Sequence, residues 1–286
     1  MRRDEIHIRD PFVLVHDGKY YMYGTRGETS WGEADGFDVF VGRDLESWEG
    51  PFEVFHNDGS FWANRDYWAP EVHLYAGMFY MFASFKKDGV CRGTQLLRSA
   101  SPTGQFLPYS DGVVTPKNWE CLDGTLYVSK AQKPYMVFCR EWLQVHDGEI
   151  WGVPLRNDLK AADGEPFLLL KASQQPGASS ENGLDYVTDG PFLFRLSDGT
   201  LAMIWSTFGS QGYCVAVAYS ENGEIDGKWN LSKDLLFEKN GGHGMIFSDL
   251  QNQRYITFHE PNDSKLERPS FYKLQERSKR LCLQTE

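Results

Sequence analysis

Apolar and polar residues alternate along most of this chain in short runs that end in a turn. The segment IRDPFVLVHDGKYYMYGT (residues 8–25) shows the pattern: an apolar run, a polar Asp-Gly turn, and a second run rich in Tyr and Met. Strand-like runs separated by a Gly-containing turn predict a β-hairpin. Helical periodicity is nearly absent, so the pattern predicts an all-β protein.

The hairpin pattern of residues 8–25 returns four more times. The later copies are APEVHLYAGMFYMFAS (69–84), DGTLYVSKAQKPYMVFCRE (123–141), DGPFLFRLSDGTLAMIWST (189–207) and HGMIFSDLQNQRYITFHE (243–260). The copies begin roughly 60 residues apart, and looser strand-like runs follow them, as in residues 37–55. Five units of four strands predict a five-bladed β-propeller with four antiparallel strands per blade.

Two packed β-sandwiches are the main alternative architecture, but they would not explain why all five units share one pattern. No linker or low-complexity segment divides the chain. We therefore expect a single propeller domain over residues 1–286.

The composition narrows the range of partners. The net charge of −11 argues against nucleic acid or an anionic membrane as a partner. No apolar run approaches the roughly 18 residues needed to span a bilayer, and the N-terminus lacks the apolar segment of a signal peptide. The five cysteines have no metal-site or redox spacing, so we expect reduced thiols. These features predict a cytoplasmic protein.

The first residue of each repeat should lie at one mouth of the central channel, because the innermost strand of a blade lines the propeller axis. These residues are Asp10, Ala69, Asp123, Asp189 and His243. A single Asp at a strand start is often only a turn residue. Three carboxylates aimed at one axis repel each other and must raise at least one pKa, which favours a functional site. One carboxyl group as acid and another as base is the arrangement that hydrolyses glycosides.

The second strand of each hairpin runs back toward the same mouth of the channel. Its end should place Glu141, Trp142 and Thr207 around the rim. Trp68, just before the second repeat, is positioned to form a stacking wall for a sugar ring. Aromatic residues make up 15% of the chain, which suits sugar binding and a β-rich core equally.

At these residues the sequence resembles glycoside hydrolase family 43, the five-bladed inverting arabinofuranosidases, xylosidases and arabinanases. The matching segments are IRDPFVLVHDGKYYMYGT, WAPEVHLYAGMFYMF, LDGTLYVSKAQKPYMVF, TDGPFLFR and GGHGMIF. The resemblance implies that Asp10 is the general base that activates water. It implies that Asp123 is a third carboxylate, which tunes the pKa of the acid and orients it.

The general acid of this family is usually the Glu of an E-G-P motif. Here the motif is TDGP, so the resemblance gives that place to Asp189. Because Asp is one methylene shorter than Glu, Glu141 stays open as an alternative proton donor.

The same resemblance extends to ligand contacts. His243 matches an axial histidine that lies beside a calcium ion or a water, so a structural calcium in the channel stays open, although calcium prefers oxygen ligands. No cofactor is expected for the chemistry. The WAPE stretch implies that Trp68 and Glu71 touch the sugar. Arg268 is expected either to hold a sugar hydroxyl or the acid, or to form a surface salt bridge.

The function expected from these features is that of an inverting exo-glycosidase on a small oligosaccharide substrate. It would release terminal α-L-arabinofuranosyl residues from arabinose- or xylose-containing oligosaccharides. A β-D-xylosidase, or one pocket with both activities, is the closest alternative, and endo-arabinanase activity is less favoured. The alternative from another class is a propeller that binds sugar without catalysis.

Overall fold

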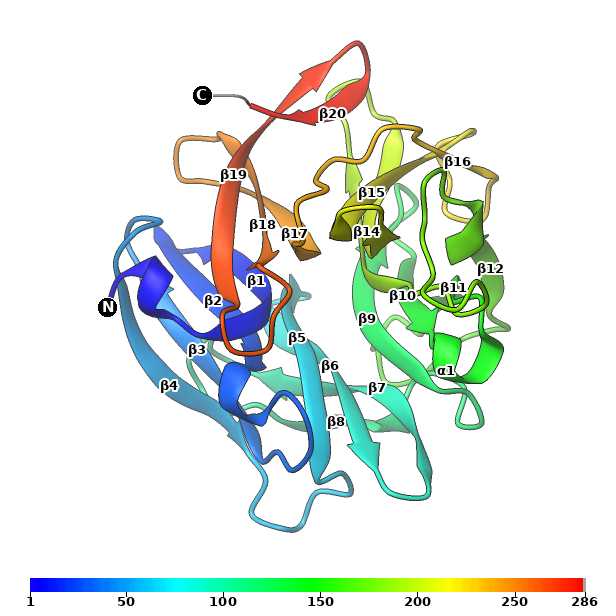
Figure 1. The fold of residues 1–286 in the computed structure, drawn as a ribbon. Helices are drawn as coiled ribbons and strands as arrows, with labels where there is room; N and C mark the ends of the chain where they lie inside the picture. The colour runs from blue at the N-terminus through cyan, green and yellow to red at the C-terminus, as the bar shows by residue number, and fades with distance from the viewer. Residues whose placement is uncertain (285–286) are drawn as a thin grey trace.

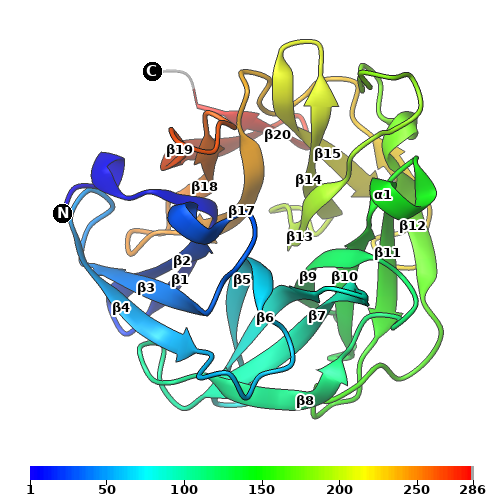
Figure 2. The same cartoon turned by 60° about the horizontal axis from the view of Figure 1, so that its bottom comes forward.

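The computed structural model describes residues 1–284, which form five four-stranded antiparallel sheets around a central axis (Figures 1 and 2). The first sheet consists of β1 (Ile8–His16), β2 (Lys19–Arg26), β3 (Gly36–Gly42) and β4 (Trp48–His56). The second consists of β5 (Arg65–Tyr75), β6 (Met78–Lys87), β7 (Val90–Ser99) and β8 (Leu107–Val113). The predicted five-bladed propeller is confirmed.

The remaining three sheets repeat this order from the axis outward. The third consists of β9 (Cys121–Val128), β10 (Pro134–Arg140), β11 (Glu149–Pro154) and β12 (Phe167–Lys171). The fourth consists of β13 (Asp189–Arg195), β14 (Leu201–Gly209), β15 (Gly212–Ser220) and β16 (Trp229–Leu231). The fifth consists of β17 (Gly242–Ser248), β18 (Arg254–Glu260), β19 (Arg268–Arg277) and β20 (Arg280–Leu283).

Helical structure within residues 1–284 is confined to single turns. These are the 3-10 turns η1 (Arg3–Glu5), η2 (Gly27–Thr29) and η3 (Ala172–Gln174), and the short helix α1 (Trp142–Val145). Within the same residues, no helix has the length and apolar character needed to cross a membrane. All five cysteines are free.

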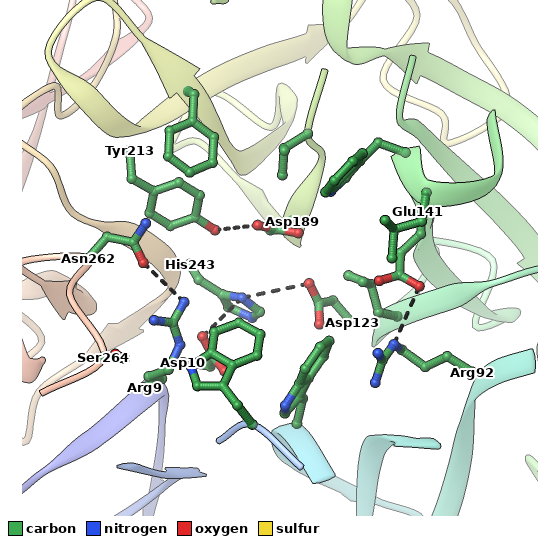
Figure 3. Close-up of a pocket in the computed structure, with 17 residues that line it drawn as sticks. Arg9, Asp10, Arg92, Asp123, Glu141, Asp189, Tyr213, His243, Asn262 and Ser264 are labelled. Atoms are coloured by element: carbon green, nitrogen blue, oxygen red, sulfur yellow. Dashed lines mark hydrogen bonds and ion pairs between the residues drawn. The ribbon is translucent and has the colours of Figure 1, made fainter. Parts of the chain in front are cut away.

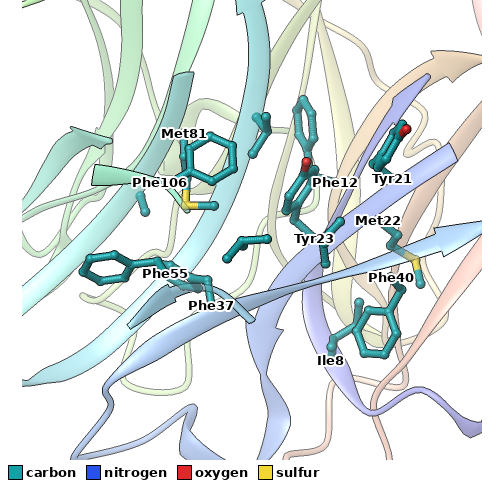
Figure 4. Close-up of a cluster of buried hydrophobic side chains, with 14 of the residues drawn as sticks. Ile8, Phe12, Tyr21, Met22, Tyr23, Phe37, Phe40, Phe55, Met81 and Phe106 are labelled. Atoms are coloured by element: carbon teal, nitrogen blue, oxygen red, sulfur yellow. The ribbon is translucent and has the colours of Figure 1, made fainter. Parts of the chain in front are cut away.

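The core lies between neighbouring blades. Because each blade packs on both faces, β2 reads as a nearly continuous buried run rather than an alternating one. Between the first two blades, Tyr23, Phe37 and Phe55 are almost completely buried (Figure 4). Burial of one such side chain stabilises the fold by roughly 1.5–3 kcal/mol. These contacts hold the innermost strands in place.

The innermost strands are β1, β5, β9, β13 and β17, which contact one another in a closed ring. Each contains the same irregularity: the pairing register breaks, and the residue at the break has a positive φ of 47° to 57°. We call this the axial position, and it is occupied by Asp10, Ala69, Asp123, Gly190 and His243. A non-glycine residue with left-handed backbone is uncommon and costs about 1–3 kcal/mol. The fold therefore keeps a strained residue at the axial position of four blades, and a glycine, which adopts this backbone without strain, in the fourth blade.

The register corrects one expectation. In the fourth blade the axial residue is Gly190, and Asp189 lies one residue earlier, paired with Ser206 of β14. A side chain at Gly190 is excluded because its Cβ would lie 2.7 Å from the His243 ring. The preceding residue, which we call the pocket position, is Arg9, Trp68, Leu122, Asp189 or Gly242 in the five blades.

Hydrogen bonds from blade to blade hold the axial backbone. In four blades a second-strand side chain accepts the axial N–H of the next blade: Thr25 from Ala69 (2.8 Å), Ser84 from Asp123 (2.9 Å), Ser206 from His243 (2.8 Å) and His259 from Asp10 (3.2 Å). The equivalent residue of β10 is Cys139, and here the N–H of Gly190 donates instead to Oδ2 of Asp123, at 3.0 Å. The one exception to the pattern therefore fixes a predicted catalytic carboxylate.

Candidate active site

A pocket of about 560 Å³ lies over the axial mouth and receives side chains from all five blades (Figure 3). Seven of the predicted site residues line it: Asp10, Trp68, Asp123, Glu141, Trp142, Asp189 and His243. The structure thus brings the three aspartates and the histidine together at one end of the axis.

Asp10 is a buried carboxylate surrounded by donors and cations. Thr25 Oγ1 donates to Oδ2 at 2.6 Å, and Oδ1 lies 3.2 Å from His243 Nδ1 and 3.4 Å from His259 Nδ1. Burial opposes ionisation, but the charge of His243, and then that of Arg9, lower the pKa of Asp10 below its ordinary value. Asp10 is therefore an ionised group, as a general base requires.

Asp123 is also buried, but its surroundings disfavour the ionised form of its carboxyl group. Burial, and then the charge of Asp10, raise the pKa of Asp123 well above the ordinary value of an aspartate. The N–H of Gly190 and the imidazole of His243, 3.6 Å away, are its nearest donors. This carboxyl group stands between Asp10 and the TDGP segment, where it acts electrostatically on both.

Asp189 is the carboxyl group whose pKa lies near neutrality. Burial, and then the neighbouring Asp123, raise its pKa to about 7. Its Oδ2 accepts a hydrogen bond of 2.8 Å from the hydroxyl of Tyr213. A carboxylic acid that remains partly protonated at pH 7 is suited to general acid catalysis.

His243 points its Nδ1 at the carboxylates of Asp10 and Asp123. No group of three or more His, Cys, Asp or Glu residues in the described part of the chain is arranged to hold a metal ion. One imidazole already engaged by two carboxylates does not form the oxygen-rich shell that calcium prefers. The residues present do not fit a calcium site built by the protein alone, and metal binding at His243 stays a prediction.

Aromatic and cationic side chains form the pocket wall on the side of the first two blades. Arg92 of β7 lies 3.6 Å over the ring of Trp68, and the Trp68 indole N–H donates to the carbonyl of Ser30. Trp31, which follows η2, packs edge-on against Trp68 at 5.2 Å and is 61% exposed. Arg9 lies over the other end of this wall, 5.3 Å from the Trp31 ring. Fixed rings beside guanidinium groups suit a flat, hydroxyl-rich ligand.

Glu141 and Trp142 line the opposite wall, where β10 leads into α1. Glu141 is buried, and its Oε2 lies 3.4 Å from Nε of Arg92. Burial raises the pKa of Glu141, and Arg92 opposes that rise. Because this carboxylate has a fixed guanidinium partner, Asp189 is the better placed of the two groups to hold a transferable proton.

Three expected contacts lie outside the pocket lining. Glu71 is buried and pairs with His73 at 2.9 Å. Thr207 is a fully buried residue of β14 and is paired with Cys214 of β15. Arg268 donates to the carbonyls of Asp4 and Glu267 at the start of β19. None of these three side chains lines the pocket, and their contact with a sugar stays a prediction.

Ten of the residues that line the pocket were not predicted from the sequence, among them Arg9, Trp31, Arg92, Tyr213 and Asn262. Arg9 had a signal, since it occupies the pocket position directly before Asp10. Arg92 and Tyr213 come from third strands, β7 and β15, and Asn262 from the loop after β18. No repeat pattern marks third strands or loops as pocket-facing, so only the folded chain shows them.

Comparison with known proteins identifies the family. The sequence profile of the glycosyl hydrolases family 43 matches residues 5–281. The chain belongs to this family. A solved structure described as an endo-arabinase from Bacteroides thetaiotaomicron is 38% identical to this family 43 protein and superimposes with a TM-score of 0.90, covering 97% of this chain and 98% of that one. The resemblance noted from the TDGP and WAPE segments is confirmed.

Two curated proteins are more distant relatives of this family 43 protein. The arabinan endo-1,5-alpha-L-arabinosidase A of Aspergillus aculeatus is 25% identical over 209 residues, which is 68% of this chain and 59% of that protein. A xylosidase/arabinosidase of Bacteroides ovatus is 26% identical over 138 residues, 43% of this chain and 42% of that protein. The matches span about half the length of these curated relatives.

Proposed function

We propose that this protein is an inverting glycoside hydrolase that cleaves α-L-arabinofuranosyl linkages in arabinan-derived chains. The observation that carries the proposal is the contrast between two carboxyl groups in one pocket. Asp10 is kept ionised by His243 and Arg9, whereas burial and Asp123 raise the pKa of Asp189 to about 7. An ionised base and a protonated acid are the pair that inverting hydrolysis requires.

In the proposed step, a water molecule hydrogen-bonded to Asp10 attacks the anomeric carbon. Asp10 accepts one proton from that water as the new carbon–oxygen bond forms. The glycosidic carbon–oxygen bond breaks, and the carboxyl proton of Asp189 passes to the departing oxygen. Asp10 ends the step protonated and Asp189 ionised, and exchange of protons with solvent restores both.

The relatives support arabinan as the substrate class. The Bacteroides thetaiotaomicron structure is described as an endo-arabinase, and the Aspergillus aculeatus protein is named for the α-1,5 linkage. Their names do not favour the release of terminal residues alone. We therefore include internal cleavage of linear arabino-oligosaccharides within the proposal. Xyloside cleavage is the second candidate, supported by the xylosidase/arabinosidase of Bacteroides ovatus.

The test is turnover of linear α-1,5-arabinopentaose, nitrophenyl arabinofuranoside and nitrophenyl xyloside, with product analysis. We expect arabinoside cleavage by the wild type, and a loss of several orders of magnitude in the Asp10→Asn and Asp189→Asn variants. Proton NMR during the reaction should show the inverted anomer first. Retained configuration would exclude the mechanism, and sugar binding without any turnover would favour a non-catalytic propeller. The product lengths distinguish terminal from internal cleavage.

A further inference from the structure

The hydroxyl of Tyr213 is the direct hydrogen-bond partner of the proposed acid. It lies 2.8 Å from Oδ2 of Asp189, and both residues line the pocket (Figure 3). Tyr213 belongs to β15, the third strand of the blade that carries Asp189, so it reaches the site from outside the innermost strand. Its side chain is almost completely buried, at 2% exposure. Burial, and then Asp189, raise the pKa of Tyr213 well above its ordinary value, so the phenol keeps its proton and acts as a donor.

The neighbouring blade leaves room for this ring. Four of the five pocket positions carry side chains that line the site, and the fifth is Gly242. A Cβ at Gly242 would lie 2.7 Å from the Tyr213 ring. The ring also stacks on His259, with centroids 5.7 Å apart and planes inclined by 19°. Tyr213 therefore occupies the space that the missing side chain of the fifth blade would take, and it is held there on two sides.

This hydrogen bond decides which oxygen of Asp189 carries the proton. A phenolic O–H that donates to Oδ2 needs a lone pair on that oxygen, so the carboxyl proton resides on Oδ1. A carboxyl group whose proton is confined to one oxygen, and whose rotation is fixed, is oriented before the substrate arrives. The fixed orientation matters here because an Asp has replaced the longer Glu of the family motif.

We propose that Tyr213 is a positioning residue that fixes the proton donor Asp189 and confines its transferable proton to Oδ1. The proposal rests on the function proposed above, in which Asp189 is the general acid. Asp123, Asp10, His243 and Tyr213 are the groups that face Asp189. Among residues 1–284, Tyr213 is the one residue whose side chain donates a hydrogen bond to this carboxyl group.

The test is the Tyr213→Phe variant, which keeps the ring and its stacking on His259. With arabinopentaose, whose leaving group must be protonated, we expect kcat/KM to fall roughly 10- to 100-fold. With nitrophenyl arabinofuranoside, whose leaving group needs little protonation, we expect less than about a threefold change. Because the lost hydrogen bond stabilised the carboxylate, the basic limb of the pH profile should move to higher pH.

Two controls separate positioning from stability. Tyr23→Phe removes a buried phenol that donates to the carbonyl of Pro102, remote from the pocket lining, and should change neither the leaving-group dependence nor the pH limb. In an Asp189→Asn background, Tyr213→Phe should cause no further loss, because Tyr213 acts through Asp189.

Titration of the Asp189 carboxyl carbon by ¹³C NMR tests the inference without a substrate. We expect a higher pKa in Tyr213→Phe than in the wild type. An unchanged titration, or an equal fall for both substrates with an unmoved pH limb, overturns the inference. A wild type that cleaves no glycoside would instead contradict the proposed function.

Discussion

Asp10 and Asp189 have the same side chain and opposite surroundings. Asp10 lies beside Thr25 and His243, which favour its charge, whereas Asp189 lies beside Asp123, which opposes it. The division of roles therefore comes from neighbours rather than from residue type. This contrast leads to two predictions at the scale of single residues.

The first prediction concerns the pH dependence of turnover. Asp189 must be protonated to act as acid, so kcat/KM should fall as pH rises through about 7. Asp10 must be ionised, and its pKa is lowered, so no acid limb is expected down to about pH 4. Initial rates between pH 4 and 9 check this profile. A maximum above pH 8 would contradict the assignment of Asp189.

The second prediction concerns the stability of Asp189→Asn. Because the folded-state pKa of Asp189 is raised, its ionisation destabilises the folded protein, beginning above the unfolded-state pKa and complete above about pH 7. Three pKa units correspond to ~4 kcal/mol. Water in the pocket screens part of this, so we expect the variant to be more stable by about 1–3 kcal/mol at pH 8.

Urea unfolding of the wild type and of Asp189→Asn at pH 8 and pH 4 measures this difference. At pH 4 the difference should nearly vanish, because the wild-type carboxyl group is then protonated in the folded state. A variant less stable than the wild type at pH 8 would show that the carboxylate stabilises the fold.

At the scale of elements, different parts of the propeller hold the axial residues in place and form the rim of the pocket. The innermost strands supply the axial and pocket positions, and second-strand side chains such as Thr25 and Ser206 hold the axial backbone. The rim comes from connections instead: the turn after β2 carries Trp31, α1 carries Trp142, and the loop after β18 carries Asn262. Specificity for chain length should therefore depend on these connections.

The third prediction concerns Trp31, whose exposed indole stands beside Trp68. Loss of one aromatic stacking contact weakens binding by about 0.5–1.5 kcal/mol. Trp31→Ala should raise KM for arabinopentaose about 3- to 10-fold and leave nitrophenyl arabinofuranoside nearly unchanged, because the short substrate does not reach the rim. Phe52→Ala, at an exposed aromatic of β4, is the matched control. Equal losses on both substrates would place Trp31 in the catalytic subsite.

At the scale of the whole molecule, the ring must close between the fifth blade and the first. No strand is exchanged between these blades in the described residues, since β1–β4 and β17–β20 form separate sheets. Side chains join them: Arg9 pairs with the fully buried Glu267, and its other nitrogen donates to Asn262 at 3.0 Å. Figure 1 shows β19 beside the N-terminal segment, and η1 contacts this strand. Arg9 therefore both joins the first blade to the fifth and lines the pocket.

The fourth prediction follows from this shared residue. Removing one partner of a buried ion pair leaves an uncompensated charge and costs about 3–5 kcal/mol. Glu267→Ala should therefore lower the free energy of unfolding by about that amount, and should also reduce kcat/KM through the loss of Arg9 orientation. Glu221→Ala, which breaks the exposed pair with Lys228, should cost less than about 1 kcal/mol. Urea unfolding compares the two variants.

Much of the fold could be predicted from the sequence because the signals of each repeat lie within one short segment of the chain. Each hairpin carries its own alternation and turn, so five similar copies predict five blades without knowledge of their contacts. Asp10 and Asp123 were located in the same way, as first residues of repeats. In the fourth blade this alignment was off by one residue, because a register break at Gly190 leaves no mark on the apolar pattern.

The sequence by itself determined the all-β class, the fivefold repeat, and the gathering of carboxylates at one end of the axis. Only the tertiary structure decided which aspartate has a lowered pKa and which has a pKa near 7, since a pKa depends on groups that are distant in the chain. It also decided that Tyr213 and Arg92 reach the pocket, whereas Glu71, Thr207 and Arg268 do not line it. The physical reason is one of range: hydrophobic alternation acts over a few residues, whereas desolvation and charge act across blades.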